Sequence, residues 1–298
     1  MTAMQTVQDF IDATAFEGFA LATVSPLVDP HAARGILDLR FNEVKVQLEG
    51  IEIGGAAARE ALIRNLRPLL FGAAWKILDL IVEYALNQAH ARPSYWRIDE
   101  KRARTRTGVV APVPFDHDIW ARLTALYAGT VEPRHCLIHR RFVFTPAGDM
   151  EQLADKAGNP IPNPNLTAIE QDAFCRVAQR VAAILQTPRF MPRDRLDIVA
   201  SLDLLTAHHG HGPLGGGATA RSPELVKVDA EHGLSGWTVD VAGAKAAAQK
   251  TFPGRPYFDV EINFPRTGFP PLVGRLEEAP ENSAVPIDPS NLPAWIQP

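Results

Sequence analysis

Hydrophobic and polar residues alternate in two short runs near the start of the chain, residues 37–41 and 44–53. A period of two indicates β-strands, because successive side chains of a strand point to opposite faces of a sheet. The polar pair Asn42-Glu43 separates the runs and indicates a hairpin, and Gly54-Gly55 ends the element. Residues 1–55 are therefore predicted to form an N-terminal region of strands and helix.

Beyond residue 56 the hydrophobic period changes to three and four, which indicates one face of a long helix. The residues of this face are Leu62, Leu66, Leu69, Ala73, Ile77, Leu80 and Tyr84. Pro68 is expected to kink or divide the helix, because proline lacks a backbone donor and clashes with the preceding turn.

A second helix is predicted to begin near residue 116, where Asp116 or Asp118 can cap its first turn. The apolar face of this helix consists of Ile119, Leu123, Leu126 and Tyr127. Pro133 cannot continue the helix, but it suits the first turn of a new one. Residues 142–144 indicate a short strand or the buried end of that new helix.

The C-terminal half contains both the hydrophobic period of helices and that of strands. Thr167 and Glu170 form a capping-box pattern that predicts a helix, and residues 241–250 are Ala-rich and typical of another. Strand-like runs occur at residues 226–228, 237–239 and 258–262. The last thirty residues are Pro-rich and expected to be mostly irregular. The prediction is an α+β protein with N-terminal strands (1–55), a helical core (56–145) and a mixed α/β C-terminal region (165–298).

Composition narrows the class of protein. The net charge is −4, the hydrophobic fraction is 46%, and no uninterrupted apolar stretch is long enough to span a membrane. The N-terminus lacks the basic segment of a signal peptide, and two cysteines do not support a disulfide framework or a zinc knuckle. We therefore expect a reduced, cytoplasmic protein with no membrane partner, no cofactor and no metal.

Although the net charge is negative, the sequence contains two local clusters of basic residues. The first consists of Arg97, Lys101, Arg102, Arg104 and Arg106, and the second consists of Arg134, Arg140 and Arg141. Such clusters are most often solvated surface, but a pair of them favours a partner that carries phosphate, such as RNA.

The second cluster lies in the run Arg134-His135-Cys136-Leu137-Ile138-His139. A guanidinium binds phosphate through two hydrogen bonds, and a histidine transfers protons near neutral pH. Residues five apart lie about 140° from each other around an ideal helix, so Arg134 and His139 must converge on a shared space to act together. The pattern predicts the chemistry needed to cut RNA without a metal, with both residues near the start of a helix.

Residues 57–143 resemble a HEPN domain, a small all-helical unit found in many prokaryotic toxins and antiviral nucleases. The family motif is an Arg, usually followed by Asn, Asp or His, then three to five residues and a His. Arg134, His135 and His139 fit this motif, and the predicted helices before it also match the family pattern.

The resemblance implies a metal-independent endoribonuclease, either a toxin or an antiviral effector. It implies that Arg134 binds the scissile phosphate, that His139 acts as general base or acid in attack by the ribose 2′-hydroxyl, and that His135 orients the phosphate or tunes its neighbours. Residues expected to bind substrate are Arg140, Arg141, Arg102 and Arg104.

The resemblance also implies partners. Family members dimerise so that two motifs face one cleft, which predicts a homodimer. Some pair with nucleotidyltransferase antitoxins that act on a Tyr two residues after the His, but Arg141 occupies that position here. An antitoxin or regulatory protein is therefore expected without modification at that position. Many proteins of this type bind RNA or nucleotides without cutting, and a non-catalytic binding protein or scaffold is the alternative.

A third possibility rests on His208, His209 and His211, the densest histidine cluster in the chain. A zinc or nickel site needs three or four ligands, and Asp203 is the single carboxylate nearby in sequence. The Gly-x-Gly-x-x-Gly spacing of the same loop lacks the following helix that a dinucleotide site requires. A loop without metal is the preferred interpretation.

Overall fold

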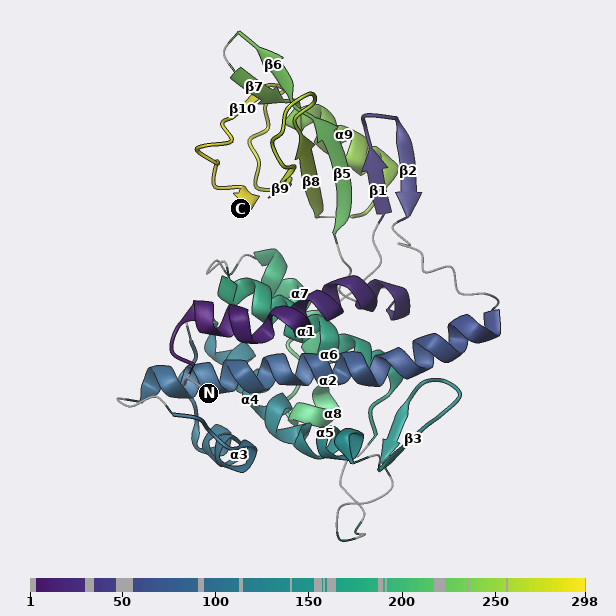
Figure 1. The fold of residues 1–298 in the computed structure, drawn as a ribbon, viewed down its shortest axis with the longest axis vertical. Helices are drawn as coiled ribbons and strands as arrows, with labels where there is room; N and C mark the ends of the chain where they lie inside the picture. The colour runs from purple at the N-terminus through teal and green to yellow at the C-terminus, as the bar shows by residue number, and fades with distance from the viewer. Residues whose placement is uncertain are drawn as a thin grey trace. The chain divides into compact units, whose positions relative to one another are not determined.

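The chain folds into two units, and each unit is built from two separated stretches of sequence. A computed structural model describes residues 4–29, 35–46, 56–90, 94–112, 115–139, 141–152, 157, 159, 165–186, 190, 192–216, 223–234, 236–255 and 257–297. One unit spans Met1–Ala32 and Gly50–Ala220, and the other spans Ala33–Glu49 and Arg221–Pro298. The content of helices and strands confirms the predicted α+β class (Figure 1).

The first unit is mainly helical. Its elements are α1 (Val7–Val28), α2 (Ala56–Ala89), α3 (Ile98–Thr107), α4 (His117–Gly129), α5 (Val131–Ile138), the hairpin strands β3 (Phe142–Phe144) and β4 (Met150–Gln152), α6 (Ala168–Gln186), α7 (Pro192–Asp203) and α8 (Thr206–His209). The long helix α2 runs through this unit and contacts α1, α3, α4, α5 and α6 (Figure 1). No helix in the described ranges combines the length and apolar character needed to cross a membrane.

The second unit contains a mixed sheet with strand order β11-β9-β8-β5-β1-β2. Its elements are β1 (Gly35–Asp38), β2 (Glu43–Val46), β5 (Glu224–Asp229), β6 (Glu231–Gly233), β7 (Gly236–Val239), α9 (Val241–Thr251), β8 (Phe258–Asn263), β9 (Leu272–Arg275), β10 (Val285–Ile287) and β11 (Ile296–Gln297). Strand β5 pairs in parallel with β1 and β8, and a smaller sheet has the order β10-β7-β6.

The unit boundaries differ from the predicted ranges 1–55, 56–145 and 165–298. The N-terminal hairpin β1–β2 belongs to the C-terminal sheet, because Leu37 is paired with Val226 across 189 positions of sequence. Helices α6 and α7 join the helical unit, where α6 packs against α1 and α2. A local hydrophobic pattern carries no information about such distant pairings. The predicted residues 47–53 lie outside the described residues.

Most individual elements agree with the sequence patterns. Helices α4, α6 and α9 and strands β5, β7 and β8 are confirmed. The Asp116 carboxylate accepts a hydrogen bond from the Ile119 amide at 2.8 Å. The predicted capping box is also formed, because the Thr167 hydroxyl accepts from the Glu170 amide and the Glu170 carboxylate accepts from the Thr167 amide. The last thirty residues are mostly irregular, as predicted, and contain the short strands β9, β10 and β11.

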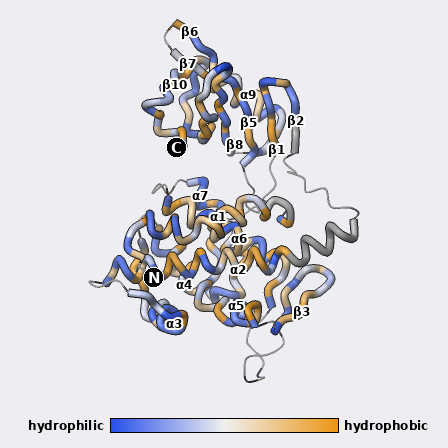
Figure 2. The backbone as a smooth tube through the Cα atoms, in the orientation of Figure 1, coloured by the Kyte–Doolittle hydropathy of each residue, from blue (hydrophilic) through white to orange (hydrophobic). Residues whose placement is uncertain are grey.

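Helix α2 departs from its predicted form in two respects. It continues through Pro68, so the helix is not divided there (Figure 1). Leu69, on the predicted core face, is 68% exposed, whereas Phe71, Ile77 and Leu78 are buried. Helices pack on more than one side of α2, which buries residues outside the predicted stripe, such as Phe71 and Leu78. Figure 2 shows hydrophobic residues along much of its described length.

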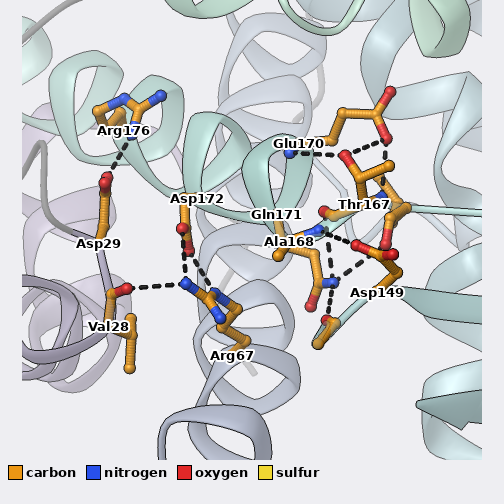
Figure 3. Close-up of polar contacts among 12 residues, drawn as sticks. Val28, Asp29, Arg67, Asp149, Thr167, Ala168, Glu170, Gln171, Asp172 and Arg176 are labelled. Atoms are coloured by element: carbon orange, nitrogen blue, oxygen red, sulfur yellow. Dashed lines mark hydrogen bonds and ion pairs between the residues drawn. The ribbon is translucent and has the colours of Figure 1, made fainter. Parts of the chain in front are cut away.

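Charged residues lie inside the helical unit where α1, α2 and α6 meet (Figure 3). The Arg67 guanidinium donates to both oxygens of Asp172, at 3.0 and 3.1 Å, and to the carbonyl of Val28 at 2.8 Å. Arg176 pairs with the buried carboxylate of Asp29. Burial raises the pKa of Asp172 to about 6, although the Arg67 guanidinium lowers it. This cluster of paired charges fixes α1 and α2 on α6.

Candidate functional site

The candidate motif lies on α5, a short helix that follows α4 almost without a break. The buried Thr130 hydroxyl donates to the Leu126 carbonyl at 2.7 Å, and Pro133 occupies the first turn of α5 as expected. Cys136 is buried on the side of α5 that faces the core. These contacts turn the other side of α5 towards solvent.

Helix α5 is shorter than the motif requires for its predicted placement. Arg134 lies within the helix, but His139 is its C-terminal capping residue, with its amide donating to the His135 carbonyl at 3.0 Å. The expectation that both residues lie near the start of a helix was therefore wrong for His139. The Arg141 amide donates to the Cys136 carbonyl at 2.8 Å and holds the following turn.

The side chain of Arg134 is directed towards α2. Its guanidinium carbon lies 5.0 Å from the centre of the Trp75 ring, and this ring stacks on Tyr127 at 5.1 Å. A cation over an indole face is attracted by the negative face of the ring. Among the described residues no contact joins Arg134 to His139, so the structure does not bring the two motif residues together within one chain.

His135 and His139 are one helical turn apart and both reach the surface of α5. The His135 side chain is about one third exposed, with Nδ1 at 3.9 Å from Oε2 of Glu132, and His139 is exposed. Burial lowers the pKa of His135, while Glu132 raises it and Arg134 and His139 lower it further. The His135 ring is therefore neutral near pH 7, which suits a proton acceptor.

One arginine of the first basic cluster reaches this site. Arg102 on α3 donates from Nη1 to Oε1 of Glu132 at 3.1 Å, so Glu132 lies between Arg102 and His135. Arg104 instead has its guanidinium 5.9 Å from the Trp96 ring. Of the other two predicted substrate-binding residues, Arg141 follows α5 directly, and Arg140 lies outside the described residues.

Lys101, the neighbour of Arg102, points the opposite way. Its ammonium group lies 2.7 Å from Asp79 and 3.0 Å from Glu83, and its side chain is 2% exposed. The Tyr127 hydroxyl donates to Asp79 at 2.8 Å. In the sequence Lys101 is grouped with the surface cations. The available signal for its burial was the pair Asp79 and Glu83, four residues apart in the otherwise apolar stretch 77–86 of α2.

His208 and His209 are buried on the short helix α8, so the predicted loop begins only after them, and specific contacts hold this segment. His208 Nε2 lies 3.2 Å from Oε1 of Glu170. Burial raises the pKa of Glu170, but hydrogen bonds from His208 and Thr167 lower it, and the pKa lies below its usual value. Burial lowers the pKa of His209, and its ring bridges the Leu202 carbonyl and the His211 amide at 3.0 and 3.1 Å. Within the described residues no three His, Cys, Asp or Glu side chains are grouped as metal ligands.

A cavity of about 710 Å³ lies between α3, residues 108–111 and α4. Its floor is formed by the small residues Ala121, Ala125 and Ala128. Arg106 and two histidines, His117 and His211, also line it. The sequence does not indicate this site, because His211 lies 94 positions after His117 and 105 positions after Arg106.

The α5 surface therefore carries two imidazoles four residues apart, and Glu132 brings the Arg102 guanidinium close to His135. Arg134 precedes His135, but its guanidinium lies over Trp75. The chain was compared with family models, curated proteins and solved structures, and none of them gives a significant match.

Proposed function

We propose that the helical unit is a metal-independent endoribonuclease of the HEPN type, with its site on the exposed end of α5. The observation that carries the proposal is the placement of His135 and His139 one turn apart beside Arg102. Two imidazoles at this spacing supply a base and an acid, and a neighbouring guanidinium neutralises phosphate charge.

The proposed reaction divides the proton transfers between the two histidines. Neutral His135 accepts the proton of the ribose 2′-hydroxyl as its oxygen attacks phosphorus, and protonated His139 donates a proton to the departing 5′-oxygen. The phosphorus–2′-oxygen bond forms, the phosphorus–5′-oxygen bond breaks, and the products carry a 2′,3′-cyclic phosphate and a 5′-hydroxyl. Arg102 and Arg141 are the cations placed to hold the phosphate.

The orientation of Arg134 favours a second candidate function. With its guanidinium over Trp75, Arg134 supports the packing of α5 on α2 rather than a phosphate. The second candidate is a helical unit that binds RNA or nucleotides through α3 and α5 without cutting them, which does not require Arg134 to contact the phosphate. Under the first proposal, a homodimer would supply the second motif for the cleft, and a toxin or antiviral effector in the cytoplasm would need an antitoxin or regulatory protein.

The test is cleavage of labelled tRNA and mRNA by the full chain in excess EDTA. His139→Ala is expected to lower the cleavage rate by a factor of about 10²–10⁴. The matched control is His232→Ala, which removes an exposed histidine from the other unit and should leave the rate unchanged. Equal rates for wild type and His139→Ala would reject the proposed site.

Binding separates the two candidate functions. RNA that binds to the wild type and to His139→Ala with equal affinity, but is cut by neither, would establish the binding protein and reject the nuclease. Arg134→Ala sharpens the distinction, because loss of cleavage with unchanged thermal stability assigns Arg134 to the phosphate. Loss of stability instead assigns it to packing.

A further inference from the structure

The cavity between α3 and α4 is a second site that the proposed cleavage chemistry does not use. Its volume of about 710 Å³ lies within the range of small-molecule pockets. The cavity is open to solvent at its rim, where Arg106, His117 and His211 are exposed. The floor consists of the small side chains of Ala121, Ala125 and Ala128, beside the Trp120 ring, and admits a flat apolar body.

The walls of this cavity are held in place by hydrogen bonds. The Trp120 indole donates to the Val109 carbonyl at 2.7 Å and fixes the segment that follows α3. Arg122 donates to the Gly212 carbonyl from Nη2 at 2.8 Å and from Nε at 3.2 Å, which anchors the loop that carries His211. The Asp203 carboxylate accepts the Leu214 and Gly216 amides and holds the other end of that loop.

The polar groups of the cavity favour an anion. Arg106, His117 and His211 line it, and none of its described lining residues is acidic. The Asp118 carboxylate lies 3.7 Å from Nδ1 of His117, but Asp118 does not line the cavity. A ligand with one flat apolar part and one anionic part would match both halves of the site.

Helix α3 connects the cavity to the α5 site. Arg102 and Arg106 are four residues apart, so they lie on the same face of α3, about 6 Å apart along its axis. Arg102 contacts Glu132 beside His135, and Arg106 lines the cavity. A single RNA strand on this face can place one phosphate at α5 and present an adjacent nucleotide to the cavity.

We propose that the cavity binds one nucleotide of the substrate RNA, with its base on the alanine floor of α4 and its phosphate on Arg106. This inference rests on the proposed ribonuclease function and names the part of the substrate that the site selects. An unpaired base is favoured, because a paired base must first lose its pairing and stacking, at a cost in free energy, to enter the cavity. The protein therefore selects single-stranded segments.

The test measures binding of free nucleotides to the full chain by calorimetry, with AMP, GMP, CMP and UMP as probes. At least one of them is expected to bind, and the matching nucleoside and ribose 5-phosphate should each bind at least tenfold more weakly. Ala125→Leu fills the cavity with a residue that favours helices and should weaken nucleotide binding at least tenfold. Its control is Ala13→Leu on the exposed side of α1, which should bind normally.

Two further variants test which residue binds the nucleotide phosphate and whether the cavity acts independently of the proposed cleavage site. Arg106→Gln should weaken binding of the nucleotide but not of the nucleoside, and the control Arg266→Gln in the other unit should have no effect. His139→Ala should bind nucleotides as the wild type does, since it does not line the cavity.

The two proposals fail in different ways. Nucleotide binding that Ala125→Leu abolishes, in a protein that cuts no RNA, would support the cavity assignment and reject the nuclease. RNA cleavage without binding of any of the four nucleotides would overturn the cavity assignment. So would nucleotide binding that Ala125→Leu leaves intact, or octanoate or benzoate binding as tightly as the best nucleotide.

Discussion

The two sides of helix α3 place neighbouring cations in opposite environments. Lys101 is 2% exposed and lies between Asp79 and Glu83 of α2, whereas the Arg102 side chain is 31% exposed and pairs with Glu132 of α5. Figure 2 shows α3 as hydrophilic along almost all its length. Lys101 and Arg102 therefore look equivalent in the sequence. The packing of α3 against its neighbours buries Lys101 and leaves Arg102 partly exposed.

The difference shows which charges are free to act on a ligand. A buried charge is costly unless it is paired, so Lys101 is committed to its two carboxylates. A half-exposed ion pair contributes little to stability and can exchange partners. Arg102 can therefore move from Glu132 to a phosphate, while Lys101 keeps α3 on α2. The cluster of Arg67, Asp172, Asp29 and Arg176 has the same structural role as Lys101 (Figure 3).

The largest expected effect is the loss of stability when the buried cation Lys101 is removed. Lys101→Met keeps most of the side-chain volume but leaves Asp79 and Glu83 buried without a cation, and should lower the free energy of unfolding by about 3–5 kcal/mol. Urea denaturation followed by helical circular dichroism measures this loss. A loss below about 1 kcal/mol would contradict the structural role of Lys101.

The next effect concerns Asp172 and pH. Its folded-state pKa is raised from 3.8 to about 6, so the stability from its protonated form is present below pH 3.8 and is lost as pH rises to about 6. Over this interval Asp172 should lower the free energy of unfolding by about 3 kcal/mol at most. Asp172→Asn should remove this part of the pH dependence, measured by denaturation at pH 4 and pH 6.5. An unchanged difference between the two pH values would show that Asp172 does not titrate there.

A smaller effect is expected on the exposed side, in the pH dependence of cleavage. If His135 is the base, the acidic limb of kcat/KM should lie below pH 6.5, because burial lowers its pKa. Glu132 raises this pKa, so Glu132→Gln should move the limb to lower pH. A limb that does not move would assign the base to another group.

The smallest effect is the stability of Arg102→Met. Its ion pair with Glu132 is about one third exposed on both sides, and such pairs contribute roughly 0–1 kcal/mol. The same variant should weaken RNA binding, measured by fluorescence anisotropy. If Arg102→Met and Lys101→Met destabilise the protein equally, the distinction between the two sides of α3 is wrong.

Local signals in the sequence predicted much of the secondary structure. Asp116 and the pair Thr167 and Glu170 cap helices where expected, because capping depends on residues three apart. The grouping of elements into units was not predictable in the same way. The β1–β5 pairing joins residues nearly two hundred positions apart, and no short-range pattern reports it.

The candidate site was predicted in part. Pro133 lies in the first turn of the predicted helix and Arg134 lies on it, but His139 caps its C-terminus, and the sequence did not predict that Arg134 turns to Trp75. The direction of a side chain depends on the helix packed beside it, here α2. The same limit applies to Lys101 and to the cavity around Arg106, both of which depend on contacts between distant segments.

The most direct test of the central claim compares a single-stranded RNA with its 2′-O-methyl counterpart, in EDTA, using wild type and His139→Ala. The account predicts that the wild type alone cuts the RNA, leaves 2′,3′-cyclic phosphate ends detectable by mass spectrometry, and does not cut the methylated strand. Cleavage of the methylated strand, equal cleavage by His139→Ala, or intact RNA in every reaction would contradict it.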